Sequence, residues 1–327
     1  MSLEDNNDFE RVEDLWFPDA DLILRAENTL FRVHSSILGA RSCVFRDMVA
    51  FPQPETPDSE GDTHDGKPVV RLHDSAAEVE VFLRAVFDSS FFMPPPSPTD
   101  VATVIGVMRL AHKYDIQYLF RRALSHLDSL YPVTCAKMLD INLEIASHHV
   151  KFPSGLNVDL ITLRAASEVG AQWILPAAYY NICTFHPKHI LSIGENWNIL
   201  SIHQQQTCLV SQAELSRATT STHQFLRYMP FPSCLLPENC QQAASESQDL
   251  LHLDAVAQSD LLPLSEWICE RISIALCPNC DKIGRDQFDK AQEIFWGRLP
   301  AIFGLPEWDE LNKMRREVLG LEEDADS

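Results

Sequence analysis

The chain has 327 residues, of which 45% are hydrophobic, so it is long enough to bury a sizeable core and to form two or more packed units. Its 47 acidic residues outnumber its 26 basic residues, which leaves a formal net charge of −21. A surface of this sign repels nucleic acid and anionic membranes, and we therefore expect neither as a direct partner.

The cysteines and the N-terminus indicate the cellular compartment. Nine cysteines, an odd number, fit a reducing compartment better than a disulfide framework. The acidic N-terminus lacks the apolar core of a secretory signal. Apolar runs such as residues 101–108 are too short to cross about 30 Å of bilayer hydrocarbon. These features predict a protein of the cytoplasm or the nucleus.

Residues 1–18 are acidic and are predicted to form a disordered arm, with ordered structure beginning at Asp19. From residue 22 to residue 33, hydrophobic residues alternate with polar ones on either side of the pair Glu27-Asn28. This alternation predicts a β-hairpin with one buried face.

Two short helices are predicted after the hairpin, the first capped by Ser35 or Ser36 and the second by Ser42. Residues 51–68 are rich in proline and acidic side chains, which predicts a solvated loop. A short strand is expected over residues 69–72.

The next helices have clear start signals. Ser75 and Glu78 form a capping box in front of a strongly amphipathic segment. The proline-rich residues 93–98 predict a stiff connector, after which Asp100 can cap a further helix. One more helix is expected over residues 117–130.

The second half of the sequence reads as mostly helical. Helices are predicted from Pro132 and over 160–169, 174–185, 201–227, 260–276 and 285–296, with a break over 230–240. We therefore predict a helical C-terminal domain over residues 132–315 and an acidic tail over 316–327.

The order of elements in the first 131 residues, together with particular residues, resembles the BTB (POZ) domain. The resemblance spans residues 19–131 and implies an α+β fold, in which a BTB-like interaction domain precedes a mostly α-helical C-terminal domain. The segments 170–178 and 295–300 resemble the helical extension of a large group of fungal BTB proteins. The residues that carry the BTB resemblance are Asp21 to Leu24, Phe31 to Leu38, Ser42, Phe45, Met48 and Ala111 to Asp115.

What the family resemblance implies is protein binding, not catalysis. It implies a homodimer formed through the hairpin and first helices, and an adaptor role for a cullin-type ubiquitin ligase or a transcriptional corepressor. No phosphate-binding, zinc-protease or serine-hydrolase motif is present, so the sequence also predicts that the chain is not an enzyme.

The resemblance also gives single residues expected roles. His34 matches a family histidine, which we interpret as a core imidazole bonded to the backbone. Asp21 matches a buried aspartate that faces a basic residue across the dimer pocket in some members. Here Cys43 stands at the basic position with Arg41 nearby, which puts a conventional charged pocket in doubt.

The remaining signature residues are expected to hold the fold. Ser42, Phe45 and Met48 belong to the second short helix. His112, Tyr114 and Asp115 lie where one predicted helix meets the next.

A separate pattern involves four cysteines in the helical half. Cys277 and Cys280 form a CxxC motif, which can supply half of a tetrahedral zinc site. Cys234 and Cys240 are the expected second half, with His223 and His252 as substitutes. If these four ligands come together, the sequence predicts a structural zinc ion bound by them.

Two other interpretations of these cysteines stay open. A CxxC motif containing proline is also typical of thiol redox sites, although the segment before Cys277 is predicted to be a helix and not a strand. The cysteines can equally be free thiols. The alternatives to an adaptor are therefore a zinc-stabilised transcriptional co-regulator and a thiol redox protein using Cys277 and Cys280.

Overall fold

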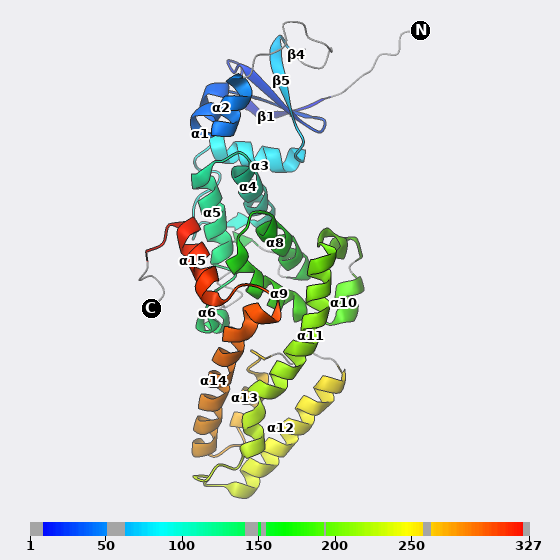
Figure 1. Cartoon of the computed structure of the whole chain (residues 1–327), viewed down its shortest axis with the longest axis vertical. Coiled ribbons are helices and arrows are strands. Elements are labelled where there is room, and N and C mark those ends of the chain that lie inside the picture. Colours follow the sequence, from blue (N-terminus) through cyan, green and yellow to red (C-terminus); the bar gives the residue numbers. More distant parts are fainter. Residues whose placement is uncertain are drawn as a thin grey trace. The chain divides into compact units, whose positions relative to one another are not determined.

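The computed structural model describes residues 9–50, 63–140, 150–151, 155–192, 194–257 and 263–322 (Figure 1). The chain divides into two compact units. The first unit is Met1–Ser129 with Glu144–Phe152, and the second is Leu130–Leu143 with Pro153–Ser327. Within the described part of the chain, none of the helices combines the length and the apolar character needed to cross a bilayer.

A five-stranded sheet forms one part of the first unit, with the strand order β1-β3-β2-β5-β4. The predicted hairpin is confirmed, because β2 and β3 are antiparallel and Leu22 pairs with Val33. Glu27 makes the turn with a φ of 52°, and β2 pairs in parallel with β5. The strands are β1 (Glu10–Trp16), β2 (Leu22–Ala26), β3 (Thr29–Val33), β4 (Thr63–His64) and β5 (Lys67–Leu72).

Strand β1 corrects the prediction of a disordered arm over residues 1–18, because residues 10–16 pair in parallel with β3. Leu15 is buried, and Asp14 accepts a hydrogen bond from Arg84 at 3.0 Å. The acidic composition of this segment did not indicate a strand, because its pairing partner β3 lies in another part of the chain. Residues 1–8 lie outside the described residues.

The range predicted for the loop, residues 51–68, also includes residues that form strands. Strand β4 and the start of β5 lie within it and pair as a second hairpin, with His64 opposite Lys67. Asp65 and Gly66 make the turn, both with positive φ. Residues 51–62 lie outside the described residues.

Helices complete the first unit. The caps predicted at Ser75 and Asp100 are confirmed, whereas the cap predicted at Ser35 or Ser36 is wrong, because the helix there begins at Ser35 and its N-cap residue is His34. The Ser75 side chain accepts a hydrogen bond from the Glu78 N–H, and Asp100 accepts one from the Thr103 N–H at 2.8 Å. A short parallel pair of strands, β6 (Thr99–Asp100) and β7 (Val150–Lys151), lies beside them. The helices are α1 (Ser35–Arg41), α2 (Cys43–Ala50), α3 (Ala76–Phe87), α4 (Val101–Lys113) and α5 (Gln117–Asp128).

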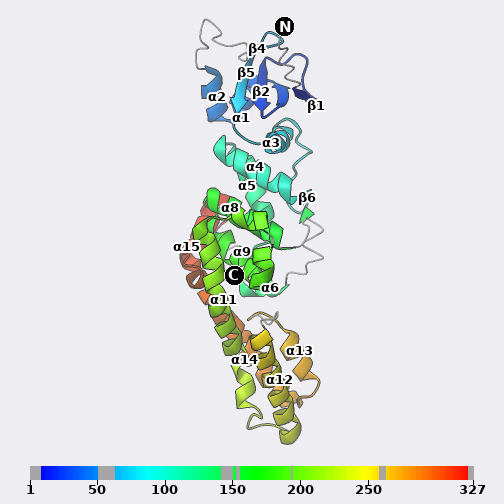
Figure 2. The same cartoon turned by 90° about the vertical axis from the view of Figure 1, so that its right-hand side faces the viewer.

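The described part of the second unit is helical, as predicted. In Figures 1 and 2, the long helices α11 and α14 run side by side, with α12 and α13 at one end of this unit and α8, α9 and α15 at the other. The α-helices are α6 (Cys135–Asp140), α8 (Leu156–Glu168), α9 (Leu175–Cys183), α10 (Pro187–Ser192), α11 (Ile202–Thr222), α12 (Pro237–Ala257), α13 (Trp267–Ser273), α14 (Pro278–Ile302) and α15 (Trp308–Leu319). The 3-10 helices are η1 (Gln172–Ile174), η2 (Gly194–Ile199) and η3 (Gln224–Tyr228).

Several helices differ from the prediction; α14, for example, begins at Pro278 and not at residue 285. The helix expected from Pro132 begins at Cys135, and α15 runs into the predicted tail as far as Leu319. Helix α12 was not predicted, and it begins at Pro237, inside the predicted break. Proline is compatible with the first position of a helix, where its missing N–H has no partner to lose, so Pro237 starts this helix instead of interrupting one.

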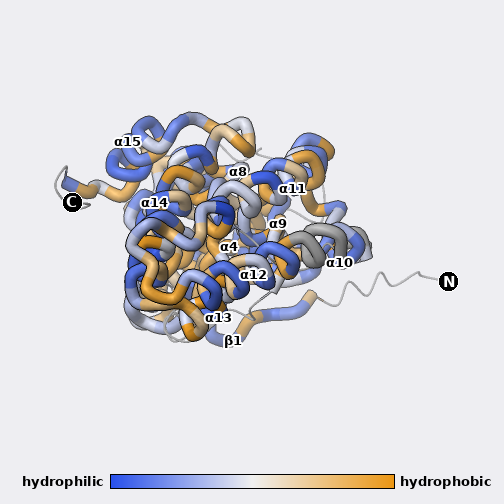
Figure 3. Tube along the Cα trace, turned by 90° about the horizontal axis from the view of Figure 1, so that it is seen from below, coloured by the Kyte–Doolittle hydropathy of each residue, from blue (hydrophilic) through white to orange (hydrophobic). Residues whose placement is uncertain are grey.

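Each end of the second unit has its own buried core. Near α8, α9 and η1, Trp173 and Ile174 are fully buried. Near α12, α13 and η3, the core contains Phe225, Phe231 and Phe288 together with cysteines. Figure 3 views the unit from the α12 and α13 end and shows hydrophilic and hydrophobic segments alternating along these helices, as expected for helices with one buried face.

Candidate metal centre and interaction domain

The four predicted cysteine ligands come from three pieces of the second unit. Cys277 is the N-cap residue of α14, and Pro278 follows it at the first helical position. Cys280 lies in the first turn of the same helix. Cys240 lies in the first turn of α12, and Cys234 lies in the preceding turn, where its N–H donates to the Phe231 carbonyl at 2.9 Å.

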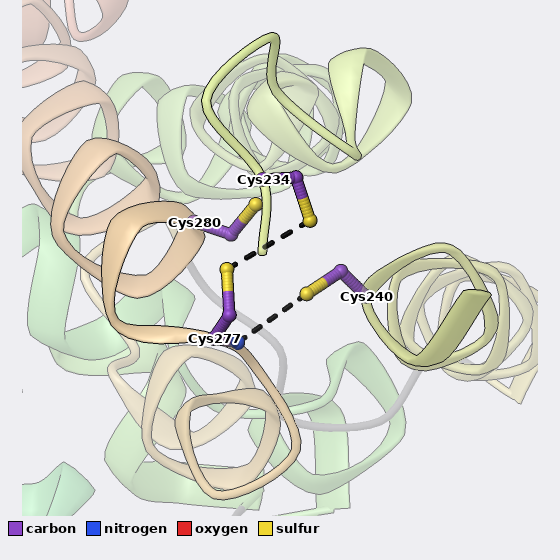
Figure 4. Close-up of side chains that lie close together, drawn as sticks. All are labelled: Cys234, Cys240, Cys277 and Cys280. Atoms are coloured by element: carbon purple, nitrogen blue, oxygen red, sulfur yellow. Dashed lines mark hydrogen bonds between the residues drawn. The ribbon is translucent and has the colours of Figure 1, made fainter. Parts of the chain in front are cut away.

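The structure brings these four side chains together (Figure 4). Their Sγ atoms all lie within 4.8 Å of one another, and the Sγ atoms of Cys234 and Cys277 are 3.7 Å apart. Tetrahedral thiolates with Zn–S distances of about 2.3 Å have sulfurs about 3.8 Å apart. All four cysteines are free thiols. The spacing of the cluster therefore matches the donor set of a tetrahedral metal site.

Backbone N–H groups point at these sulfurs. The Leu235 N–H lies 3.4 Å from the Cys277 Sγ, and the Cys277 N–H lies 3.3 Å from the Cys240 Sγ. The pKa of Cys277 is lowered to about 6, because the N–H groups of Leu235 and Cys280 stabilise its thiolate. Burial raises the pKa of Cys280 to about 12 and also raises that of Cys240. Cys277 therefore ionises before Cys240 and Cys280.

The surroundings of the four-cysteine cluster are apolar, and they leave it only partly accessible to solvent. Cys240, Cys277 and Cys280 are buried, whereas Cys234 is half-buried. Asn279 donates a hydrogen bond to the Ser233 carbonyl at 2.7 Å, which ties the loop before α12 to the start of α14. The cluster thus joins two helix starts and one loop at a single point.

Of the two histidines considered as substitutes, His223 does not join the cysteines. His223 is buried beside Phe288, at 5.0 Å between ring centroids, and its Nδ1 is bonded to the Thr219 carbonyl at 2.9 Å. Burial lowers its pKa. His223 is therefore a core residue, and the His252 side chain lies outside the described residues.

The surroundings of Cys277 share one feature with thiol redox sites. The thiol stands at a helix N-terminus, a position that favours a thiolate. However, the element before it is helix α13 and not a strand, as the sequence predicted. The described residues around Cys277 therefore lack the strand of a thioredoxin-like unit.

In the first unit, Ser42, Phe45 and Tyr114 form a buried group. Ser42 Oγ accepts a hydrogen bond from the Phe45 N–H at 3.0 Å, which confirms its predicted cap, and donates one to the Tyr114 carbonyl at 2.5 Å. The rings of Phe45 and Tyr114 stack at 4.5 Å. The Tyr114 hydroxyl donates to Asp74 at 2.7 Å, a partner that no sequence pattern had indicated.

The interpretation of His34 as a core imidazole bonded to the backbone is wrong. Its side chain is half-buried, packs on Phe17 and has its Nε2 3.6 Å from an Asp19 carboxylate oxygen. The hydrogen bonds at the start of α1 are made by Asp21 instead, which accepts them from the Ser35 N–H at 2.9 Å and the Ser35 hydroxyl at 2.6 Å. Asp21, the exposed residue just before strand β2, thereby caps α1.

The other signature residues lie at or near the surface. His112 is exposed and packs its ring 5.1 Å from Phe120, and Met48 is half-buried. Asp115 adopts a φ of 52° after α4 and accepts a hydrogen bond from the Cys43 thiol at 3.1 Å. Cys43 therefore bonds within the same chain, to the junction of α4 and α5.

The surface of α1 and α2 carries apolar side chains. Ile37 is 39% exposed and Val49 is 40% exposed, and Met48 and Val44 are half-buried on the same helix pair. Exposed aliphatic groups on neighbouring helices are suited to pairing with another protein surface.

Sequence reasoning also missed a half-buried carboxylate in the second unit. Asp159 of α8 accepts hydrogen bonds from the Tyr131 hydroxyl at 3.0 Å and the Asn181 amide at 3.2 Å. Burial raises its pKa to about 6. Its position within an amphipathic helix gave no signal, because its partners lie in separate segments.

Comparison with protein families identifies the first unit. The family model of the BTB/POZ domain matches residues 17–130. This stretch, with its hairpin, short helices and paired α4 and α5, is a BTB/POZ domain, and it makes the chain a protein with a protein–protein interaction module. A search of curated proteins found no match to the chain.

Proposed function

We propose that this protein is a self-associating adaptor that pairs through its BTB/POZ domain. The observation that carries the proposal is the apolar surface of α1 and α2, on which Ile37 and Val49 are exposed. Burying such groups against a second copy removes them from water, which stabilises a dimer by about 25 cal/mol for each Å² of apolar area.

An adaptor needs a second binding surface, and we propose that the helical unit presents it to a client. The class of domain supports a cullin-type scaffold or a corepressor as the larger assembly, in the cytoplasm or the nucleus. The net charge of −21 makes direct DNA binding unfavourable, so a role as a transcriptional co-regulator requires a partner that contacts DNA.

Self-association is tested by light-scattering mass of the full chain at several micromolar concentrations. We expect a dimer, and we expect Ile37→Glu to shift the mass toward a monomer because it places a charge in the paired surface. Ile161→Glu is the matched control, because Ile161 is 40% exposed but belongs to α8. A wild-type monomer, or an equal effect of both variants, would contradict the proposal.

We also propose that Cys234, Cys240, Cys277 and Cys280 bind a structural zinc ion. The observation that carries this proposal is the convergence of four sulfurs within 4.8 Å. When bound, zinc would act as a tetrahedral cross-link between the starts of α12 and α14. The N–H groups of Leu235 and Cys277 would offset part of the thiolate charge.

The zinc proposal is tested by elemental analysis of full-length protein purified under reducing conditions. We expect one zinc ion per chain, and we expect a chelator to lower the melting temperature. Metal-free protein with a melting temperature that does not respond to added zinc would overturn the proposal and leave the free-thiol interpretation.

A further inference from the structure

We propose that Cys234 and Cys277 form an oxidisable pair through which a hydroperoxide releases the metal from the four-cysteine site. The inference rests on the zinc proposal above and extends it to regulation. Its basis is the geometry of one sulfur pair and the unequal exposure of the four cysteines.

Cys234 is the point of access to the cluster. It is half-buried, whereas the other three cysteines are buried. It lies in the loop before α12, where residues 232, 233, 235 and 236 are exposed, as are the first three residues of α12. A small oxidant from solvent therefore meets the Cys234 sulfur before it meets the others.

Cys277 is placed to complete the reaction. Its Sγ lies 3.7 Å from the Cys234 Sγ, close enough that a modest movement of the exposed loop brings the two sulfurs into bonding contact (Figure 4). Cys280 is buried and fixed within the first turn of α14. We therefore expect the loop cysteine to be the partner, and not the second cysteine of the CxxC motif.

The chemistry consumes one peroxide for each pair. The Cys234 thiolate attacks hydrogen peroxide, the O–O bond breaks, and a sulfenic acid and hydroxide form. The Cys277 thiolate then attacks the sulfenic sulfur, forming the disulfide and expelling a second hydroxide. Two protons from solvent convert both hydroxides to water, and the two sulfurs have passed two electrons to the peroxide.

This disulfide would keep the loop at Cys234 attached to α14 but would free the start of α12. The metal loses two of its four ligands and leaves, while the loop at Cys234 remains attached to α14 through the disulfide. Cys240 is left without the metal, so the start of α12 loses its cross-link to α14, although the Cys277 N–H still contacts the Cys240 sulfur. Oxidation would thus loosen one helix of the unit without detaching the loop.

The experiment treats reduced, zinc-loaded, full-length protein with hydrogen peroxide. Zinc release is followed with a chromogenic chelator, and the disulfides are mapped by mass spectrometry of unreduced peptides. We expect zinc release to accompany a Cys234–Cys277 disulfide and a dithiol to reverse both.

Two variants make the result specific. Cys234→His keeps a zinc-binding side chain but removes the exposed thiol, so we expect release at least about tenfold slower. Cys43→Ser is the matched control, because Cys43 is equally half-buried but lies outside the cluster, and its release rate should equal that of the unmodified chain.

The outcomes separate the two proposals. If the protein contains no zinc before treatment, the zinc proposal is overturned, and the proposal of metal release falls with it. Bound zinc that is lost with a Cys277–Cys280 disulfide, or lost at an equal rate from Cys234→His, overturns only the oxidisable pair.

Discussion

The BTB/POZ domain and the α12 end of the helical unit are stabilised in different ways. In the domain, Phe45, Phe82 and Tyr114 pack ring against ring, and the helix starts are capped by Ser42, Ser75 and Asp100. At the α12 end, Cys240, Cys277 and Cys280 stand within the core, and Cys234 packs against it. Side chains of the domain itself fill the core of the first region, whereas the second places thiols where aliphatic residues would otherwise pack.

The largest expected effect comes from Cys240→Ala. A structural zinc site contributes on the order of 10–16 kcal/mol to folding, so losing a ligand should unfold the α12 end and abolish the response to chelator. The measurement is thermal unfolding with and without chelator. The control is Cys269→Ala, a buried cysteine of the same core outside the cluster, which should keep its chelator response. A chelator response that persists in Cys240→Ala would refute the cross-link.

Phe45→Ala tests the aromatic core of the BTB/POZ domain. Phe45 is fully buried between two aromatic rings, so its loss should lower the free energy of unfolding by about 3–5 kcal/mol. Met48→Ala on the same helix should cost less, because Met48 is half-buried. Chemical denaturation measures both. The sensitivity of the protein to chelator should be unchanged in each, and a change would show that the two regions are not independent.

A smaller effect, dependent on pH, is expected from Asp159→Asn. The folded-state pKa of about 6 exceeds the ordinary 3.8, so the folded chain binds more protons than the unfolded chain between these values. Stability contributed by this group is therefore present at low pH and lost as the pH rises through about 6. The variant should remove this loss, gaining at most about 3 kcal/mol at pH 7 and nothing near pH 3.5. A gain that does not vary with pH would contradict this assignment.

The smallest effect is expected from Ser75→Ala. Removing the N-cap of α3 should cost about 1 kcal/mol, because the Glu78 N–H loses its acceptor. Ser42→Ala should cost more, since Ser42 is buried and also donates to the Tyr114 carbonyl. Equal costs for the two serines would show that this second hydrogen bond adds nothing.

The sequence by itself determined the features that depend on neighbouring residues. The hairpin follows from alternation around Glu27, and the caps at Ser75 and Asp100 act on N–H groups only three residues away. The CxxC spacing likewise brought two thiols close together, although the sequence did not predict that α14 begins at this motif. Cys234 and Cys240, themselves only six positions apart, were the expected companions, and the structure places all four together.

Only the tertiary structure decided the features that depend on distant partners. Residues 10–16 form a strand because β3 offers its edge, and His34 stands near the surface because Asp21 takes the capping role at Ser35. The contact between Cys234 and Cys277 spans 43 positions along the chain. No local pattern encodes such separations, because the free energy that fixes them comes from burying surfaces contributed by separate segments.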